Sequence, residues 1–73
     1  MNVNFYLGRI EYVFDQNAPL VKIMKWNKPL IIDNQLVKAI DKEQARSKLM
    51  DYAIKGKPDG AMIFEVRIHD LIE

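Results

Sequence analysis

The fold is decided by residues 41–69, which read DKEQARSKLMDYAIKGKPDGAMIFEVRIH. Asp41 is a good helix N-cap, because its carboxylate can accept hydrogen bonds from the free amides of a first helical turn. The apolar residues after it share one helical face at i, i+4, i+7 and i+8 spacing: Ala45, Leu49, Tyr52 and Ala53. Gly56 ends such a helix, and Pro58 prevents it from resuming. The pattern predicts one amphipathic helix over residues 41–55.

A strand is predicted after this helix, at residues 61–69. The apolar side chains at every second position are expected on one face of it: Met62, Phe64, Val66 and Ile68. Glu65 and Arg67 fall on the opposite face. Because an amphipathic helix needs an apolar surface to cover, the two elements together predict a helix packed on one face of an antiparallel sheet.

Residues 3–14 are rich in β-branched and aromatic side chains and predict the first strand. Their apolar alternation occupies one face up to Leu7 and the opposite face from Ile10 onward, with Gly8 between them. A one-residue insertion at a glycine produces such a change of face, so we expect a β-bulge at Gly8. A strand buried on both faces is the alternative.

The residues between the first predicted strand and the predicted helix follow a less regular pattern. Residues 20–26 are predicted to form a second strand, antiparallel to the first through a turn at residues 17–19. Residues 30–40 permit two interpretations, which are a tight hairpin turn at residues 33–34 or a short helix over residues 34–40. The predicted order of elements is therefore β-β-(β)-α-β.

The whole chain, residues 1–73, is predicted to be one α+β domain with a small antiparallel sheet of three to five strands. A chain of 73 residues buries only about 60% of the surface that its unfolded form exposes. Disulfides, metal ions or self-association often supply the missing stability of such small domains. The chain has no cysteine and only one histidine, His69, which argues against a disulfide and against a metal site. We therefore expect a homodimer.

Charge and hydropathy give few indications of other partners. Lys and Arg number 11 and Asp and Glu number 10, and the net charge of +1 does not indicate nucleic acid or a membrane surface. The N-terminus shows no export signal. The longest apolar runs are far shorter than the roughly 18 residues of a membrane span. We expect a cytoplasmic protein without a membrane partner.

The residues that nucleophilic catalysis requires are nearly missing. The chain lacks Cys and Thr, and its one serine, Ser47, is expected on the exposed side of the helix. His69 has no partner at a spacing that predicts a triad or a metal pair, and the carboxylates are scattered over turns and caps. The three glycines are isolated, which argues against a phosphate-binding loop. We expect no catalytic residue, no cofactor and no enzymatic activity.

Two groups of side chains are candidates for binding. Apolar residues beyond the predicted core indicate contact with another protein, and the candidates are Trp26, Met50 and Ile54. The alternative is a nucleic-acid contact, because an aromatic ring can stack on a base while ammonium groups meet phosphates. Its candidate residues are Lys22, Lys25, Trp26 and Lys28.

The layout of Asp41-Lys-Glu-Gln-Ala-Arg followed by Phe64-Glu-Val-Arg-Ile-His-Asp-Leu-Ile resembles that of small proteins of phages and mobile elements. The resemblance covers about half of the chain and rests on pattern rather than on a diagnostic motif. It implies a small inhibitor or modulator of a larger host protein, and it assigns no site residues. We therefore expect a non-enzymatic protein-binding module that docks through strand edges or through the helix flank at Met50 and Ile54. A small nucleic-acid-binding protein is the alternative.

Overall fold

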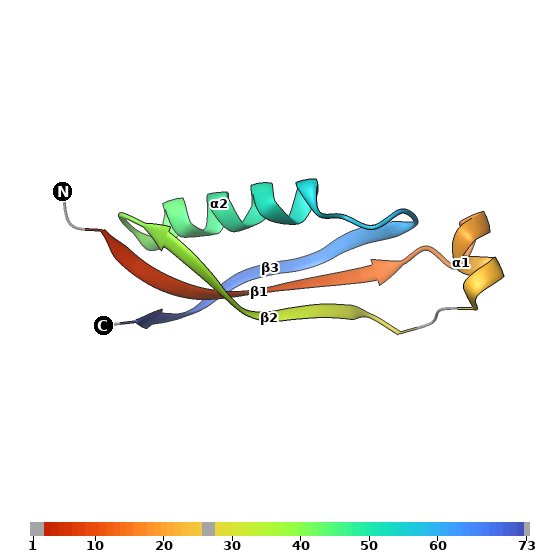
Figure 1. Cartoon of the computed structure of the whole chain (residues 1–73), viewed down its shortest axis with the longest axis horizontal. Coiled ribbons are helices and arrows are strands. Elements are labelled where there is room, and N and C mark those ends of the chain that lie inside the picture. The colour runs from red at the N-terminus through yellow and green to blue at the C-terminus, as the bar shows by residue number, and fades with distance from the viewer. Residues whose placement is uncertain (1–2, 26–27, 73) are drawn as a thin grey trace.

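The computed structural model describes residues 3–25 and 28–72 and has an α+β fold. Its elements follow in the order β1 (Asn4–Phe14), α1 (Pro19–Met24), β2 (Leu30–Ala39), α2 (Lys42–Lys55) and β3 (Ala61–Ile72). The strands form one antiparallel sheet in the order β2-β1-β3, and α2 lies along one face of it (Figure 1). The predicted fold class and the predicted antiparallel sheet are therefore confirmed.

Local hydrogen bonds set the bounds of α2. The Asp41 carboxylate accepts a hydrogen bond from the backbone amide of Gln44 (2.7 Å). The Gln44 side chain in turn accepts one from the amide of Ile40 (2.9 Å), so the chain is held on both sides of the helix start. At the other end, Gly56 donates its amide to the carbonyl of Tyr52 (2.9 Å). The predicted N-cap and the predicted end of this helix are both confirmed.

The core lies between α2 and the sheet. α2 turns three small or aliphatic side chains toward the strands: Ala45, Leu49 and Ala53. They pack in one cluster with alternate residues of β1, of which Tyr6, Ile10 and Tyr12 are buried. Gly8 belongs to the same face of β1, and a Cβ at this position would overlap Cδ2 of Leu49. α2 therefore reaches the backbone of β1 at the point where the strand has no side chain.

The β-bulge predicted at Gly8 lies instead in the two neighbouring strands. β1 keeps a regular alternation of burial through Gly8, so the bulge predicted for this strand is wrong. Opposite Gly8, β2 contains an extra residue at Asp33-Asn34, where Asn34 has a φ of 55°, and β3 contains one at His69. The apolar residues change face along β1 because both faces of this strand carry apolar side chains.

β3 confirms the predicted strand but not its predicted faces. A second bulge adds an extra residue at Phe64, where the register with β1 shifts. Met62 and Phe64 are therefore exposed, by 53% and 65%. Val66 and Ile68 are buried, and Ile63 packs against the core. The prediction that Met62 and Phe64 share a face with Val66 and Ile68 is wrong, because a bulge reverses the alternation.

Residues 20–26, predicted as a strand, fall partly in helix α1, so the described residues contain two helices rather than one. Pro19 stands in the first helical turn, where its missing amide is not needed and its fixed φ suits a helix. Val21 is buried, and its Cγ2 would lie 2.9 Å from a Cβ at Gly60, whose φ is +80°. This local chemistry and packing override the strand-like composition.

Residues 30–39 form one continuous strand, so neither the hairpin nor the helix predicted for this segment is present. The turn-prone pair Asp33-Asn34 bends the strand without reversing it, because the bulge absorbs the positive φ of Asn34. Asparagine tolerates this left-handed conformation better than most residues.

A long, narrow shape follows from this arrangement. The principal extents are 48 × 17 × 12 Å and the radius of gyration is 14.2 Å, whereas a compact domain of this length is expected to have a radius of about 11 Å. The accessible surface of 5363 Å² likewise exceeds the roughly 4,700 Å² expected of a compact chain of this mass. One helix covers one face of a three-stranded sheet, and the described elements leave the opposite face without cover (Figure 1).

Candidate functional site on the open face of the sheet

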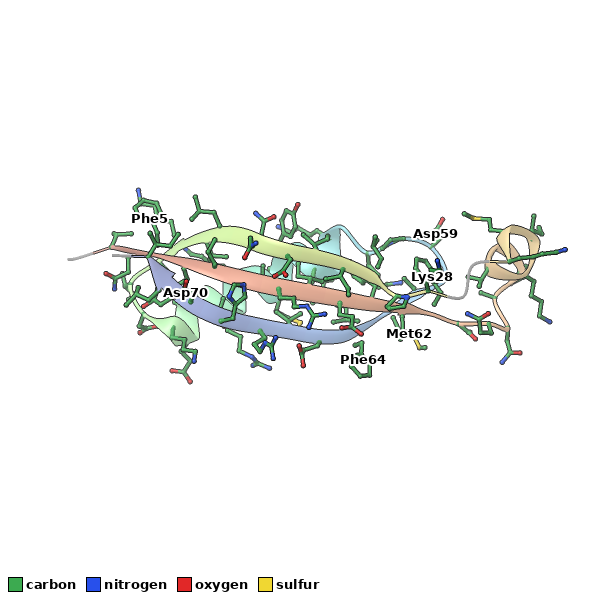
Figure 2. All side chains as sticks on the ribbon, turned by 90° about the horizontal axis from the view of Figure 1, so that it is seen from below. Phe5, Lys28, Asp59, Met62, Phe64 and Asp70 are labelled. Carbon is green, nitrogen blue, oxygen red and sulfur yellow. The ribbon has the colours of Figure 1, made fainter. Side chains whose placement is uncertain are left out.

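The face of the sheet that points away from α2 is here called the open face. The described elements leave it uncovered, and Figure 2 looks onto it. β1 supplies its middle line of side chains: Phe5, Leu7, Arg9, Glu11 and Val13. β2 and β3 supply the flanks. Charged and apolar side chains both occur on this face, in separate zones.

Four charged side chains form the middle zone, here called the ionic band: Arg9, Glu11, Glu65 and Arg67. Arg9 Nη2 lies 3.2 Å from Glu11 Oε1, and Arg9 Nη1 lies 3.8 Å from Glu65 Oε1. Arg67 Nε lies 3.7 Å from the same oxygen of Glu65. The side chains of Arg9 and Glu11 are only 25% and 17% exposed, so the inner part of the band is partly shielded from water. Each charge therefore has an oppositely charged neighbour within the chain.

The ionic band consists of a positive row and a negative row. Arg9 pairs directly with Arg67 across the β1–β3 ladder, and Glu11 pairs with Glu65. Like charges directly opposite each other destabilise a ladder. The ion pairs between the rows offset this repulsion inside one chain, while each row presents a single sign of charge to the outside.

Apolar zones lie beyond the ionic band at both ends of the open face. The first apolar end consists of Phe5, Leu7, Leu36 and Ile72, and Lys38 and Asp70 lie beside them on the same face, paired with Phe5 and Leu7. The second apolar end consists of Val13, Met62 and Phe64, together with Ile31, which pairs with Glu11 at the border of the ionic band. Figure 2 shows Phe5 at one end of the sheet and Met62 and Phe64 at the other. Six of these eight side chains are between 43% and 65% exposed. Single exposed apolar residues are ordinary, but their grouping on one face indicates a contact surface.

A further polar contact crosses the open face beside the ionic band. His69 Nε2 in β3 lies 3.4 Å from Asp33 Oδ1 in β2, so this contact spans the central strand. Both residues lie at the bulges opposite Gly8. A shallow depression at this point is lined by Arg9, Asp33, Asn34, Arg67 and His69. Among the described residues, its lining includes no hydroxyl or thiol side chain.

Both edges of the sheet are irregular. β2 has its bulge at residues 33–34, and the Lys48 ammonium donates a hydrogen bond to the Lys38 carbonyl of this edge strand (2.7 Å). β3 has its bulges at Phe64 and His69. Bulges and lysines are devices that keep an edge strand from pairing with another strand. The open face is therefore better suited to contact than the strand edges that the sequence suggested.

Two of the three protein-contact residues predicted from the sequence, Met50 and Ile54, do not belong to the open face. Met50 is partly buried and packs against the core. Ile54 is 57% exposed and lies on α2. Trp26 lies outside the described residues.

The three lysines of the predicted nucleic-acid site lie in or near α1, at one end of the molecule (Figure 1), while Trp26 lies outside the described residues. Lys22 is in the last turn of α1, and Lys25 is its C-cap, with a φ of 55°. Lys28 follows shortly after, and all three side chains are exposed. The structure brings these lysines to one end of the molecule.

Sequence reasoning missed the ionic band. The alternating charges Arg9-x-Glu11 and Glu65-x-Arg67 were visible, but their grouping depends on the register between two strands that are far apart in the chain. The available signal was the combination of opposite charge order in the two segments with an antiparallel pairing, which puts like charges in register.

Comparison with known proteins adds no assignment to this geometry. No protein family, curated protein or solved structure matches this chain. Among residues 3–25 and 28–72, no three or more His, Asp or Glu side chains gather as metal ligands. The same part of the chain contains no helix that is both long and apolar enough to cross a membrane.

Proposed function

We propose that this chain is a small, non-enzymatic protein-binding module that docks through its open face. The observation that carries the proposal is the group of six large apolar side chains, each at least 43% exposed, on a face that the described elements leave uncovered. Burial of apolar surface drives most protein association and contributes about 25 cal/mol per Å². A contact on this face would therefore gain free energy that the folded chain alone does not.

The apolar ends and the ionic band have different roles in this proposal. The apolar ends supply affinity, and each contributes one phenylalanine, Phe5 or Phe64, a residue type enriched at interfaces. The ionic band supplies orientation, because complementary charges select the partner and its register more than they add affinity. A partner is expected to present apolar side chains on both sides of a zone of mixed charge.

The proposed mode of action is steric. The molecule is 48 Å long, so docking along its length covers an extended strip of the partner rather than a single pocket. A chain that covers such a strip acts as an inhibitor or modulator of a larger protein, as the resemblance to small phage and mobile-element proteins implies. No chemical step is needed for this role.

Affinity capture from a bacterial lysate, with and without nuclease, tests the proposal. Leu36→Thr and Met62→Thr remove one apolar side chain from each end of the open face and keep a strand-forming residue. Ile54→Gln is the matched control, because Ile54 and Leu36 are similarly exposed, at 57% and 53%, but Ile54 lies on α2. We expect a nuclease-resistant protein that the wild type and Ile54→Gln retain and that the open-face double variant loses.

Other outcomes would overturn parts of this proposal. Loss with Ile54→Gln but not with the open-face variant would move the docking surface to α2. Retention that disappears with nuclease would support nucleic-acid binding by Lys22, Lys25 and Lys28 instead.

A further inference from the structure

Each row of the ionic band spans two strands, and the two rows carry charges of opposite sign. The positive row consists of Arg9 and Arg67, and the negative row consists of Glu11 and Glu65, with each row spanning the same two strands. The rows are neighbours along β1 because their members are two residues apart on one face. A surface with this pattern is complementary to a second copy that is rotated by a two-fold axis running across the strands.

We propose that the open face binds a second copy of this chain, face to face, with the strands of the two copies antiparallel. The two-fold axis runs across the strands between the two rows. This rotation puts Arg9 over Glu11 of the second copy, and Arg67 over Glu65 of the second copy. An isologous contact of this kind closes on itself and gives a dimer. The inference rests on the proposed function, since it assigns a partner to the same open face.

The apolar side chains of the central strand fit the same rotation. It places Leu7 over Val13 of the second copy. Because Leu7 pairs with Asp70 and Val13 with Met62, it also places Asp70 of each copy over Met62 of the other. Two sheets packed in this way form a sandwich with helices on its two outer faces, which is a usual solution for sheets with two apolar faces.

The charge pattern also excludes the opposite orientation. A two-fold axis along the strands would put Arg9 over Arg9 and Glu11 over Glu11 of the second copy. Like charges brought together at an interface are strongly unfavourable. The ion pairs themselves add little affinity, because desolvation offsets most of their attraction. Their role is to select the antiparallel arrangement.

The area of the open face predicts a weak dimer. Three strands about 4.8 Å apart, with 11 residues in the central one at about 3.3 Å each, give a footprint of roughly 500 Å². A face-to-face pair then buries roughly 1,000 Å² in total, which is near the lower limit of specific interfaces. We therefore expect dissociation in the micromolar range. A larger partner on the open face would compete with the second copy.

Analytical ultracentrifugation of charge-reversed chains tests this arrangement. Arg9→Glu/Arg67→Glu makes the whole ionic band negative, and Glu11→Arg/Glu65→Arg makes it positive. We expect each variant alone to have a dimer dissociation constant at least about tenfold higher than the wild type. An equimolar mixture of the two variants is expected to form a heterodimer, which also shows that both are folded.

A third variant tests the orientation. The chain with all four charges exchanged keeps the self-complementary pattern, so it is expected to form a homodimer like the wild type but not to pair with the wild type. Pairing between the two would overturn the antiparallel arrangement. Wild type that stays monomeric up to near-millimolar concentration, or dimers unaffected by charge reversal, would overturn the inference.

These outcomes are distinct from failure of the proposed function. A monomeric chain that still retains a protein through Leu36 and Met62 would remove only the self-association. A charge-sensitive dimer that retains no other protein would instead remove the proposed role as a modulator of a larger partner.

Discussion

The two faces of this sheet carry similar apolar residue types but differ in how far these residues are exposed to solvent. On the face under α2, Ile10 and Tyr12 are exposed by no more than 1%. On the open face, Phe5 and Leu36 are exposed by 43% and 53%. α2 is the only cause of the difference among the described elements, because β1 is apolar on both faces. The comparison teaches that burial on one face comes from inside the chain, while the described elements leave the other face in contact with solvent.

The largest expected effect is on the covered face, at Gly8. Gly8→Ala would put a methyl group into Leu49 Cδ2 and within 3.1 Å of the Arg67 carbonyl oxygen, so we expect a loss of about 3 kcal/mol in the free energy of unfolding. Chemical denaturation measures it. The double variant Gly8→Ala/Leu49→Ala should lose less than the sum of the two single changes, because the second makes room for the first. Additive losses would show that Leu49 does not limit the space at Gly8.

A smaller effect on the free energy of unfolding is expected from the Tyr12 hydroxyl, which lies on the same face. It donates a hydrogen bond to the Ala53 carbonyl (2.7 Å) in the last turn of α2, where carbonyls lack helical donors. Tyr12→Phe leaves this buried carbonyl without its donor and is expected to cost about 1.5 kcal/mol at neutral pH. Thermal or chemical unfolding of both proteins gives the difference.

The same variant has a predicted pH dependence. Burial, and to a lesser extent the nearby Tyr52, raise the pKa of Tyr12 above its usual value of 10.0. The hydroxyl is protonated in both states below pH 10, so its contribution is complete there. As pH rises further, the unfolded chain ionises first, and the advantage of the wild type over Tyr12→Phe should shrink. A constant difference up to pH 11 would contradict this assignment.

Two aspartates, one at the start of α2 and one on the open face, test the comparison with smaller expected losses of stability. Asp41 caps α2, and Asp41→Ala is expected to destabilise the chain by about 1 kcal/mol. Asp33 contacts His69 on the open face and is more than half exposed, so Asp33→Ala is expected to cost less than about 0.5 kcal/mol. Unfolding experiments on both variants at one pH test the order. Equal losses would mean that the Asp33–His69 contact supports the fold as much as the helix cap does.

The smallest expected effect on stability comes from the apolar residues of the open face. Leu36→Thr should change the unfolding free energy by less than about 0.5 kcal/mol in dilute solution, because Leu36 is already in contact with water. Leu49→Ala, at a buried leucine of α2, should cost about 3 kcal/mol. If Leu36→Thr strongly lowered the free energy of unfolding at concentrations where the chain is monomeric, the open face would have to be covered by the chain itself.

The sequence predicted those parts of the fold that depend on neighbouring residues. The helix that begins after Asp41 and ends at Gly56 is confirmed, because its cap and its stop both lie within one segment. Its predicted apolar stripe is only partly present, since Tyr52 is 50% exposed and not in the core. The strand predicted at residues 20–26 is wrong, because Pro19 and the contact of Val21 with Gly60 decide that segment. The bulge predicted at Gly8 is wrong because the glycine makes room for a helix that comes later in the chain.

The candidate site was harder to predict for a related reason. The open face is defined by strand register and by which face α2 occupies, and neither is visible in local periodicity. Trp26, Met50 and Ile54 were chosen because they are apolar outside a predicted core, but the predicted faces of β3 were incorrect beyond the bulge at Phe64. Met62 and Phe64, placed by the sequence on one face with Val66 and Ile68, are instead exposed contact candidates.

The bulges in β2 and β3 also bear on how the chain behaves when it is crowded. A sheet with regular edges can recruit strand after strand and grow without limit into fibrils. Here both outer strands are interrupted, at residues 33–34 on one side and at Phe64 and His69 on the other. These bulges therefore disfavour growth in the plane of the sheet, although the chain has an exposed apolar face.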